Sequence, residues 1–310
     1  MFEEARVNSR VKAISFDPAP IFIVGHWRSG TTFLHNLLSC ERQFCTADFI
    51  AAVSPHDFFP TPLHRITRPL LRKMLPDVRP MDEMPLREDL PQEHDMALAA
   101  MGAPSFMNCF YFPRDRDQTF ADNVLFADDS NAAQNWRESL RYYLAKLSVL
   151  NPGKRLLLKG PADSARIVQI RHLFPGALFI HVHRHPSDVL ASTQRLYREL
   201  TPRLALQDYN FAHLETFIEF GYRTIMNRLK NGLNEIPKKD VATVRFDDLV
   251  GNPLEAVAAI CRQFGIKGEE STQPAMDRFI SGLKKPMRRP ASTRMQCIDL
   301  KPIFDWLGYS

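Results

Sequence analysis

The sequence predicts an α/β fold of three layers, in which a central parallel sheet is flanked by helices. Two observations predict it. Short apolar stretches typical of buried strands alternate with helical patterns, most of them ten or more residues long, and this alternation indicates right-handed crossovers between parallel strands. The chain has 310 residues, of which 45% are hydrophobic and 24% charged, and this composition is ordinary for a globular protein.

The first half of the chain contains one strand pattern and several helices. Ala19–Val24 is apolar and rich in β-branched residues, as expected of a buried strand. Thr31–Leu38 has apolar residues at helical spacing. Prolines are dense in residues 50–91, and because proline removes a backbone donor and interrupts helices, we expect an irregular, partly helical insertion there. Further helices are predicted to begin near Gln92 and to span Ala132–Leu150.

The second half alternates strand and helix more regularly. Strands are predicted at Arg155–Leu158, Ala177–His183 and Val241–Arg245. Helices are predicted over Ala162–Leu173, from Pro186 or Ser187 onward, over Phe211–Leu233 and over Pro253–Phe264. Because open parallel sheets bind ligands at the carboxyl ends of their strands, we expect the functional residues directly after the strands.

Composition and charge exclude several classes of protein. The formal charge of +5 is too dilute to indicate a nucleic-acid-binding protein, and no apolar run approaches the roughly 18 residues of a membrane span. The N-terminal residues lack the apolar stretch of a secretory signal. The five cysteines are odd in number and have no CxxC spacing, which argues against a disulfide framework or a zinc site. We therefore expect a cytoplasmic protein with no transmembrane segment and no metal site.

The residues after Ala19–Val24 match the spacing of a phosphate-binding loop. Gly25 and Gly30 are separated by four residues and a helix follows, but Thr31 stands where the loop of a nucleoside triphosphatase has its lysine. The glycines let the backbone wrap an oxyanion, and the helix N-terminus supplies free N–H donors. With Arg28 as its only cation, the loop suits a terminal 5′-phosphate or phosphosulfate better than a triphosphate with Mg²⁺.

A second motif follows the strand Ala177–His183. Arg184 leaves the carboxyl end of this strand, Pro186 opens the next helix, and Ser192 lies about two turns along it. An arginine fork and a hydroxyl can together hold a phosphate on the far side of a ribose.

With these two motifs the sequence resembles sulfotransferases that use 3′-phosphoadenosine 5′-phosphosulfate, the nucleotide sulfate donor. It most closely resembles bacterial members of the branch related to tyrosylprotein sulfotransferases. Segments similar to this branch are residues 79–82, 91–95, 157–161 and 245–253, and the resemblance covers about residues 18–265. It implies a single sulfotransferase domain, 1–310, with the proline-rich insertion 50–91 near the acceptor site and a basic loop and tail at 284–310.

The resemblance also implies roles in donor binding. The 5′-phosphosulfate is expected on Arg28, Ser29, Gly30, Thr31 and Thr32, and the 3′-phosphate on Arg184 and Ser192. In sulfotransferases a late basic loop closes over the 3′-phosphate, and Arg288 or Arg289 is expected to do so here, although a solvated surface loop is an equal alternative. Phe246 stands where some relatives have a tyrosine near the adenosine.

Three catalytic roles follow from the resemblance. Arg28 and Lys159 are expected to stabilise the transferring group and the leaving phosphate, and Glu93 is expected to be the general base. His94 and Asp163 are alternative bases, with a helix cap favoured for Asp163. Because neighbours on a helix do not share a face, we expect only one of Glu93 and His94 to point inward.

The predicted enzyme moves a sulfuryl group from the nucleotide donor to a hydroxyl of a small-molecule, lipid or carbohydrate acceptor. Aromatic and methionine residues in 50–91 and 101–112 favour an apolar or amphipathic acceptor. A phosphate-loop kinase and a non-catalytic nucleotide-binding protein are the alternatives. The sequence leaves the identity of the acceptor open, and it does not decide between a monomer and a homodimer.

Overall fold

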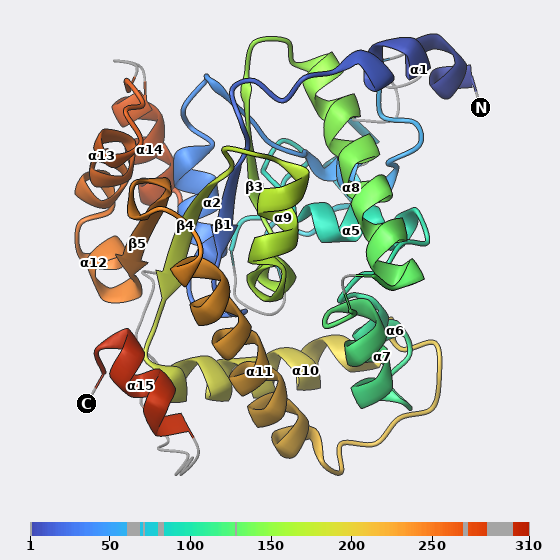
Figure 1. Ribbon diagram of the computed structural model, residues 1–310, viewed down its shortest axis with the longest axis vertical. Coiled ribbons are helices and arrows are strands. Elements are labelled where there is room, and N and C mark those ends of the chain that lie inside the picture. Colours follow the sequence, from blue (N-terminus) through green and yellow to red (C-terminus); the bar gives the residue numbers. More distant parts are fainter. Residues whose placement is uncertain are drawn as a thin grey trace.

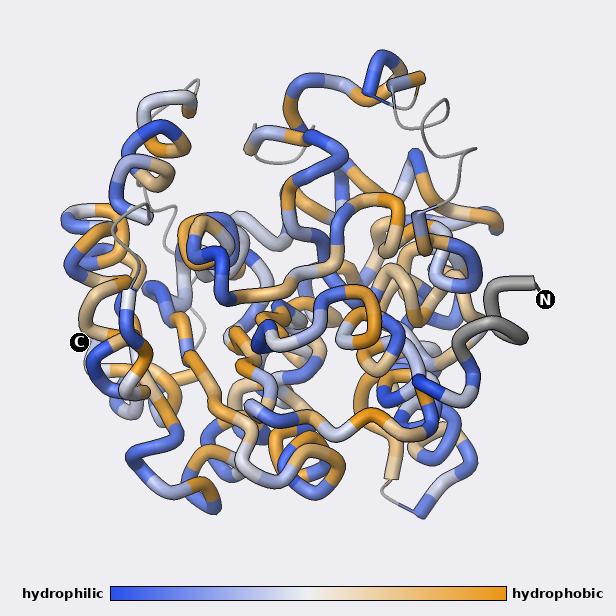
Figure 2. Tube along the Cα trace, turned by 90° about the horizontal axis from the view of Figure 1, so that it is seen from above, coloured by the Kyte–Doolittle hydropathy of each residue, from blue (hydrophilic) through white to orange (hydrophobic). Residues whose placement is uncertain are grey.

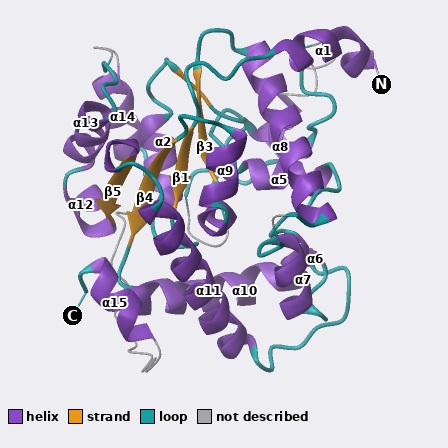
Figure 3. Ribbon diagram, in the orientation of Figure 1, coloured by secondary structure: helices purple, strands orange, loops and turns teal. Residues whose placement is uncertain are grey.

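A five-stranded parallel sheet forms the centre of the computed structural model, which describes residues 2–60, 69–70, 72–79, 84–127, 129–268, 272–283 and 300–309 (Figure 1). The strand order is β2-β3-β1-β4-β5. Every neighbouring pair is parallel. The strands are β1 (Ile21–Val24), β2 (Phe44–Cys45), β3 (Arg155–Lys159), β4 (Leu178–His183) and β5 (Val241–Arg245). The predicted α/β fold class is confirmed, and Figure 3 shows the strands in orange among the purple helices.

The two faces of the sheet bury two separate hydrophobic clusters, because successive side chains of a strand point to opposite faces. Ile21 and Ile23 of β1 belong to one cluster, and Phe22 and Val24 belong to the other. All four are fully or almost fully buried. This burial on both faces explains why β1 is continuously apolar rather than alternating.

Helices cover both faces and complete the three layers. The cluster around Ile21 and Ile23 is closed by α2 (Thr31–Leu38), α12 (Phe246–Gly251), α13 (Pro253–Gln263) and α14 (Thr272–Ser281). The cluster around Phe22 and Val24 is closed by α3 (Phe49–Val53), α5 (His94–Ala100), α6 (Asn108–Tyr111), α7 (Arg116–Asn123), α8 (Asn131–Leu150), α9 (Ile167–Leu173), α10 (Pro186–Leu204), α11 (Leu214–Asn234) and α15 (Lys301–Leu307).

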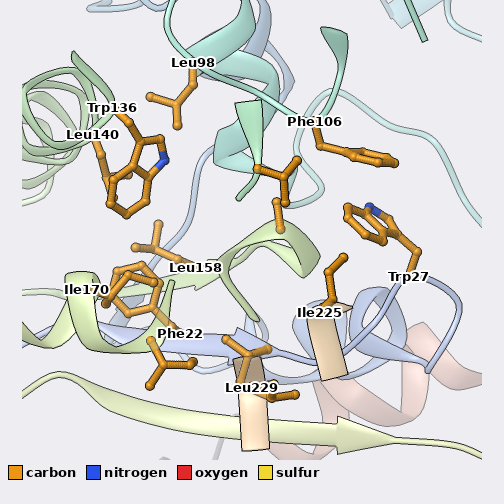
Figure 4. Packing of buried hydrophobic residues seen from close by; sticks show 14 of the residues in the cluster. Phe22, Trp27, Leu98, Phe106, Trp136, Leu140, Leu158, Ile170, Ile225 and Leu229 are labelled. Carbon is orange, nitrogen blue, oxygen red and sulfur yellow. The ribbon is translucent and has the colours of Figure 1, made fainter. Parts of the chain in front are cut away.

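The larger cluster is rich in aromatic side chains. Figure 4 shows Phe22 of β1 and Leu158 of β3 packed near Trp136 of α8, with Trp27 and Phe106 stacked farther along. Helical turns carry both hydrophobic and hydrophilic residues, as the alternating colours along the tube in Figure 2 indicate. The N-terminal helix α1 (Phe2–Ala13) packs on α8 through a small third cluster that contains Val11. Among the described residues no helix is both long and apolar enough to cross a membrane.

Most predicted elements are present with boundaries shifted by a few residues. The helix expected from Phe211 begins at Leu214, and the one expected near Gln92 begins at His94. Several elements were not predicted, namely α1, β2, α6, α7, α12, α14 and α15. The two residues of β2 are too few to make a pattern. In the insertion 50–91 the described residues contain α3 and an isolated antiparallel bridge between Val78 and Pro85.

Candidate functional site

The loops that follow β1, β3, β4 and β5 meet at the carboxyl ends of these strands. Ile23 of β1 is in register with Lys159 of β3, and Val24 is in register with His181 of β4. The strands therefore end at similar levels, and the residues that follow them come together. The backbone N–H of Gly25, directly after β1, donates a hydrogen bond of 2.8 Å to Ser164 Oγ in the short helix η1 (Pro161–Ala165) that follows β3.

The loop after β1 has a conformation that requires its glycines. Gly25 has a φ of 138° and Gly30 a φ of 104°. A Cβ at Gly25 would overlap the carbonyl oxygen of Val182, and one at Gly30 would lie 2.5 Å from the Phe246 ring. Between them Arg28 has a φ of 73°, which is unusual for a residue with a side chain. The loop thus keeps Arg28 in a strained conformation, which is typical of functional sites.

Arg28 joins the two motifs of the sequence directly. Its Nε donates a hydrogen bond of 2.9 Å to Ser192 Oγ on α10. The sequence places these residues on opposite ends of the expected nucleotide, in the phosphosulfate loop and in the 3′-phosphate pair. The fold brings both motifs into a single cluster.

The start of α2 is open to an anion. Its N-cap is Gly30, which has no side chain to bond the first-turn amides. Ser29 is 2% exposed, and its Oγ has no hydrogen-bond partner among the described residues. Thr31 is buried and Thr32 half-buried in the first turn. A buried hydroxyl beside uncapped helix amides fits a phosphate or sulfuryl oxygen, which would satisfy both.

Arg184 lies at the end of β4, as predicted, and stacks on Phe246. The carbon of its guanidinium lies 4.3 Å from the centroid of the Phe246 ring. Its Nη2 is 3.3 Å from Asp188 Oδ2, whereas its buried Nε has no hydrogen-bond partner within the described part of the chain. Burial lowers the pKa of Arg184, and the positive charge of Arg28 lowers it further, against the opposing effect of Asp188. Arg28 and Arg184 thus place two positive charges close enough to influence one another at this end of the sheet.

Lys159 and Glu93 form an ion pair at the end of β3, the strand next to β1. Lys159 ends β3 and its side chain is 2% exposed, whereas the side chain of Glu93 is 27% exposed. The Nζ of Lys159 donates a hydrogen bond to Glu93 Oε1. A buried ammonium and a carboxylate that solvent can reach therefore lie side by side.

His94 and Asp163 form a second pair that is fully buried. His94 Nε2 lies 3.0 Å from Asp163 Oδ2, and the side chains are 1% and 2% exposed. Burial by itself lowers the pKa of His94, but the charges of Asp163, Asp95 and Glu93 outweigh it, so that the pKa is raised. Gly160 lies against this pair, because a Cβ there would approach His94 Cε1 to 2.7 Å and Asp163 more closely still.

Two expectations about Asp163, Glu93 and His94 are wrong. Asp163 does not cap a helix, since its carboxylate faces His94 and neither η1 nor α9 has a side-chain cap. Glu93 and His94 both face the end of β3, because Glu93 pairs with Lys159, the last residue of the strand, and His94 pairs with Asp163 shortly after it. Glu93 is the N-cap of α5 with extended dihedral angles, φ −73° and ψ 129°, so the rule for neighbours within a helix does not apply to it.

Residues 20–270 match the profile of the sulfotransferase family. The chain belongs to this family. It is 28% identical over 265 residues, 86% of this chain and 67% of the relative, to the omega-hydroxy-beta-dihydromenaquinone-9 sulfotransferase Stf3 of Mycobacterium bovis and, equally, of Mycobacterium tuberculosis. The sulfotransferase assignment excludes the non-catalytic alternative and decides against the kinase.

Two solved structures show the same fold. The sulfotransferase STF9 from Mycobacterium avium has a TM-score of 0.81 at 19% identity, over 98% of this chain and 80% of that one. STF1 from Mycobacterium tuberculosis H37Rv has a TM-score of 0.71 at 20% identity, over 88% of this chain and 74% of that one. At this identity the likeness establishes the architecture.

Other predicted residues of this sulfotransferase are either outside the described part of the chain or in the hydrophobic core. Arg288 and Arg289 lie outside the described residues, as does Met81. Phe58, Phe106 and Phe110, which favoured an apolar acceptor, are buried by at least 96% and belong to the core. In contrast, Ser164 and Asp188 contribute to the site through Gly25 and Arg184, although no motif in the sequence marks them.

Proposed function

We propose that this sulfotransferase uses 3′-phosphoadenosine 5′-phosphosulfate as donor and sulfates a hydroxyl of a small-molecule, lipid or carbohydrate acceptor. The observation that carries the proposal is the hydrogen bond between Arg28 and Ser192, which follow β1 and β4, together with the Lys159–Glu93 ion pair at the end of the neighbouring β3. It supports one site in which donor-binding groups adjoin an acid–base pair. The unsatisfied Ser29 Oγ and Arg184 Nε fit an anionic ligand with several oxygens.

Glu93 is the proposed general base. Its side chain is 27% exposed, whereas those of His94 and Asp163 are 1% and 2% exposed, so an acceptor hydroxyl can approach only Glu93 without rearrangement. His94 and Asp163 are proposed as positioning residues, because the buried pair holds the start of α5 against the segment after β3. Glu93 itself is the N-cap residue of that helix.

Each step of the proposed transfer assigns a role to a residue of this chain. The acceptor oxygen bonds to sulfur while the bond between sulfur and the bridging oxygen of the donor breaks. Glu93 takes the proton of the acceptor hydroxyl. Lys159 and Arg28 offset the negative charge that moves to the leaving phosphate, and the amides at the start of α2 hold its oxygens.

Arg184 is proposed to distinguish the donor from other adenine nucleotides. A guanidinium binds phosphate through parallel hydrogen bonds, and its place over Phe246 leaves the edge of the fork available. Phe246 also packs under Gly30, so it links the two phosphate sites and offers a ring face for the adenine. A nucleotide without a 3′-phosphate would leave this arginine uncompensated.

The first test is calorimetric titration with 3′-phosphoadenosine 5′-phosphate, ADP and ATP without added metal. We expect micromolar affinity for the bisphosphate, much weaker binding of ADP and ATP, and loss of at least tenfold in affinity on Arg184→Ala. Arg203→Ala is the matched control, because Arg203 also lies on α10 but is 53% exposed and forms an ion pair with Glu199 on the same helix. Equal binding of ATP and the bisphosphate would contradict the donor assignment.

The acceptor is proposed to be a lipid or other amphipathic alcohol. The support is the relative Stf3, whose name gives a hydroxylated menaquinone as acceptor. A screen with radiolabelled donor should compare long-chain primary alcohols, prenyl alcohols and simple sugars. Sulfation of sugars alone would replace the lipid proposal and leave the donor assignment intact.

A further inference from the structure

A buried arginine outside the sulfotransferase site has unsatisfied donors within the described chain and also lines a cavity. Arg116, the first residue of α7, is 8% exposed, and its Nε and Nη2 have no hydrogen-bond partner among the described residues. The guanidinium carbon lies 5.4 Å from the Tyr197 ring centroid and 5.5 Å from that of Phe217. Ring faces attract a cation but do not accept its N–H bonds, so the group remains costly to bury.

Other buried cations of this protein show how such a cost is usually met. Arg166, 2% exposed, donates from Nε to the carbonyl of Val124, and Lys146, fully buried, donates to the carbonyl of Pro55. Both also lie over aromatic rings. Arg116 has the rings but no acceptor for Nε and Nη2 among the described residues, and Arg166 likewise has none for Nη1. Arg116 in addition lines a cavity, where its guanidinium can meet an external acceptor.

Arg116 opens onto a cavity of about 520 Å³ at which two helices begin. Arg114 and Arg116 line it from the start of α7, and Ala212 and His213 line it from the start of α11. The N-cap residues of these helices, Asp115 and His213, make no side-chain cap bond. Helix N-termini carry partial positive charge and uncapped amides, so both favour an anion in the same cavity.

The cavity favours a singly charged group attached to an apolar body. Asp117 and Asp208 also line it and limit its affinity for multiply charged anions. A second cavity, of about 610 Å³, shares Asp117, His213 and Phe217 with the first, and Phe220 on its wall is 41% exposed. An apolar chain that leaves the Arg116 cavity can therefore contact Phe217 and Phe220, with Asp117, Thr216 and Glu219 also lining its path.

We propose that the Arg116 cavity, between the start of α7 and the start of α11, is a second ligand site that binds an amphiphile with a singly charged oxyanion head, either a sulfate ester or a carboxylate. This site differs from the donor site. Two rings, Tyr197 and Phe106, lie between Arg116 and Trp27 of the phosphate loop. The ring centroids of Tyr197 and Phe106 are 6.4 Å apart, and those of Phe106 and Trp27 are 3.8 Å apart. Saturating the donor site with the bisphosphate therefore leaves the Arg116 cavity accessible to a separate titration.

The test is calorimetric titration of the bisphosphate-saturated protein with octyl sulfate, octanoate, octanol and inorganic sulfate, each below any micellar concentration. We expect octyl sulfate or octanoate to bind one site, octanol and inorganic sulfate to bind at least tenfold more weakly, and Arg116→Met to abolish this preference. The exposed Arg203→Met is the matched control and should bind as the parent does. The better of the two oxyanion probes identifies the head group.

Two further measurements separate binding from a structural role of Arg116. If the guanidinium is held for a ligand, Arg116→Met unfolds at the same temperature as the ligand-free parent or higher, because it removes an unpaired buried charge. A lower unfolding temperature together with unchanged probe binding would overturn the proposal. Should Arg116→Met fail to fold, Asp208→Asn decides: at least threefold tighter binding of the oxyanion probe supports the site, and unchanged affinity overturns it.

Discussion

Two ion pairs formed by consecutive residues lie on either side of Gly160, yet they differ in exposure. Glu93 pairs with Lys159, and a quarter of its side chain is open to solvent, whereas His94 pairs with Asp163 at 1% and 2% exposure. Both pairs join the start of α5 to the segment that ends β3. One sequence motif thus supplies a group that an acceptor can reach and a group that it cannot.

The difference shows how residue type alone misleads in assigning a general base. Histidine as a residue type has an unperturbed pKa that suits base catalysis near neutral pH, and Asp163 offers a carboxylate just after the family-like segment 157–161. Burial nevertheless separates them from an acceptor, and the neighbouring carboxylates raise the pKa of His94, which favours its protonated form beside Asp163.

The largest expected effect is on Glu93. Glu93→Gln should lower kcat by about 10²–10⁴-fold, because the amide cannot accept the acceptor's proton. Binding of 3′-phosphoadenosine 5′-phosphate should stay within about threefold, since Glu93 is assigned to the acceptor. Steady-state kinetics and titration measure both. Full turnover of Glu93→Gln would contradict this assignment and indicate that the general base belongs to the buried pair of His94 and Asp163. The surface variant Glu255→Gln is the control and should change neither kcat nor the affinity for the bisphosphate.

Lys159→Ala should follow with a loss of about 10²–10³ in kcat. The reason is the removal of a buried positive charge that stabilises the transferring group. Lys154→Ala, just before the same strand and exposed, is the control. If Lys159→Ala lowers donor affinity by the same factor and leaves kcat unchanged, Lys159 acts in ground-state binding only.

Breaking the buried pair should affect stability more than chemistry. Asp163→Asn should reduce the free energy of unfolding by about 1–3 kcal/mol, because it weakens a partner that buried His94 requires. Asp240→Asn breaks the pair with Arg171, whose side chains are 14% and 26% exposed, and should cost about 0–1 kcal/mol. Denaturant unfolding measures both. A kcat loss in Asp163→Asn as large as that of Glu93→Gln would show that the two pairs act together in catalysis.

The smallest effect is a difference in the pH dependence of stability. The pKa of His94 is raised in the folded protein. Its contribution to the free energy of unfolding is therefore complete below about pH 6.5, the pKa of a histidine in the unfolded chain, and is lost as pH rises through the folded pKa. Burial lowers the pKa of four other histidines, to about 4 for His26 and His183 and to about 3 for His35 and His181. Their contribution to folding stability is therefore lost as pH falls below about 6.5.

His94→Gln should therefore flatten only the alkaline limb of the stability profile. Unfolding by denaturant between about pH 5 and pH 9 gives both limbs. The acid limb should be the same in the variant and the parent, since the lowered histidines are unchanged. An identical alkaline limb in the two proteins would mean that His94 is not protonated in the fold.

The predictable part of this protein lies where a local pattern carries the physics. Continuous apolar strands such as Ile21–Val24, glycines at fixed spacing, and an arginine directly after a strand are all local, and the predicted helix Thr31–Leu38 and strand Val241–Arg245 have the predicted bounds. Boundaries set by tertiary contacts were less accurate, as at the start of α11. No recognisable pattern marks Ser164 or Asp188, because each contributes to the site through a single contact. Ser164 accepts a hydrogen bond from Gly25, far away in the sequence, and Asp188 pairs with Arg184, one helical turn before it.

The sequence by itself determined the α/β class, the phosphate loop and the sulfotransferase family, because all three depend on residue order within short segments. The tertiary structure decided which distant residues meet. It brought Arg28 to Ser192, paired Glu93 with Lys159 and His94 with Asp163, and left Arg116 without hydrogen-bond acceptors for Nε and Nη2 among the described residues. The physical reason is that burial and partner choice depend on the packing of elements far apart in the chain, which no local pattern encodes.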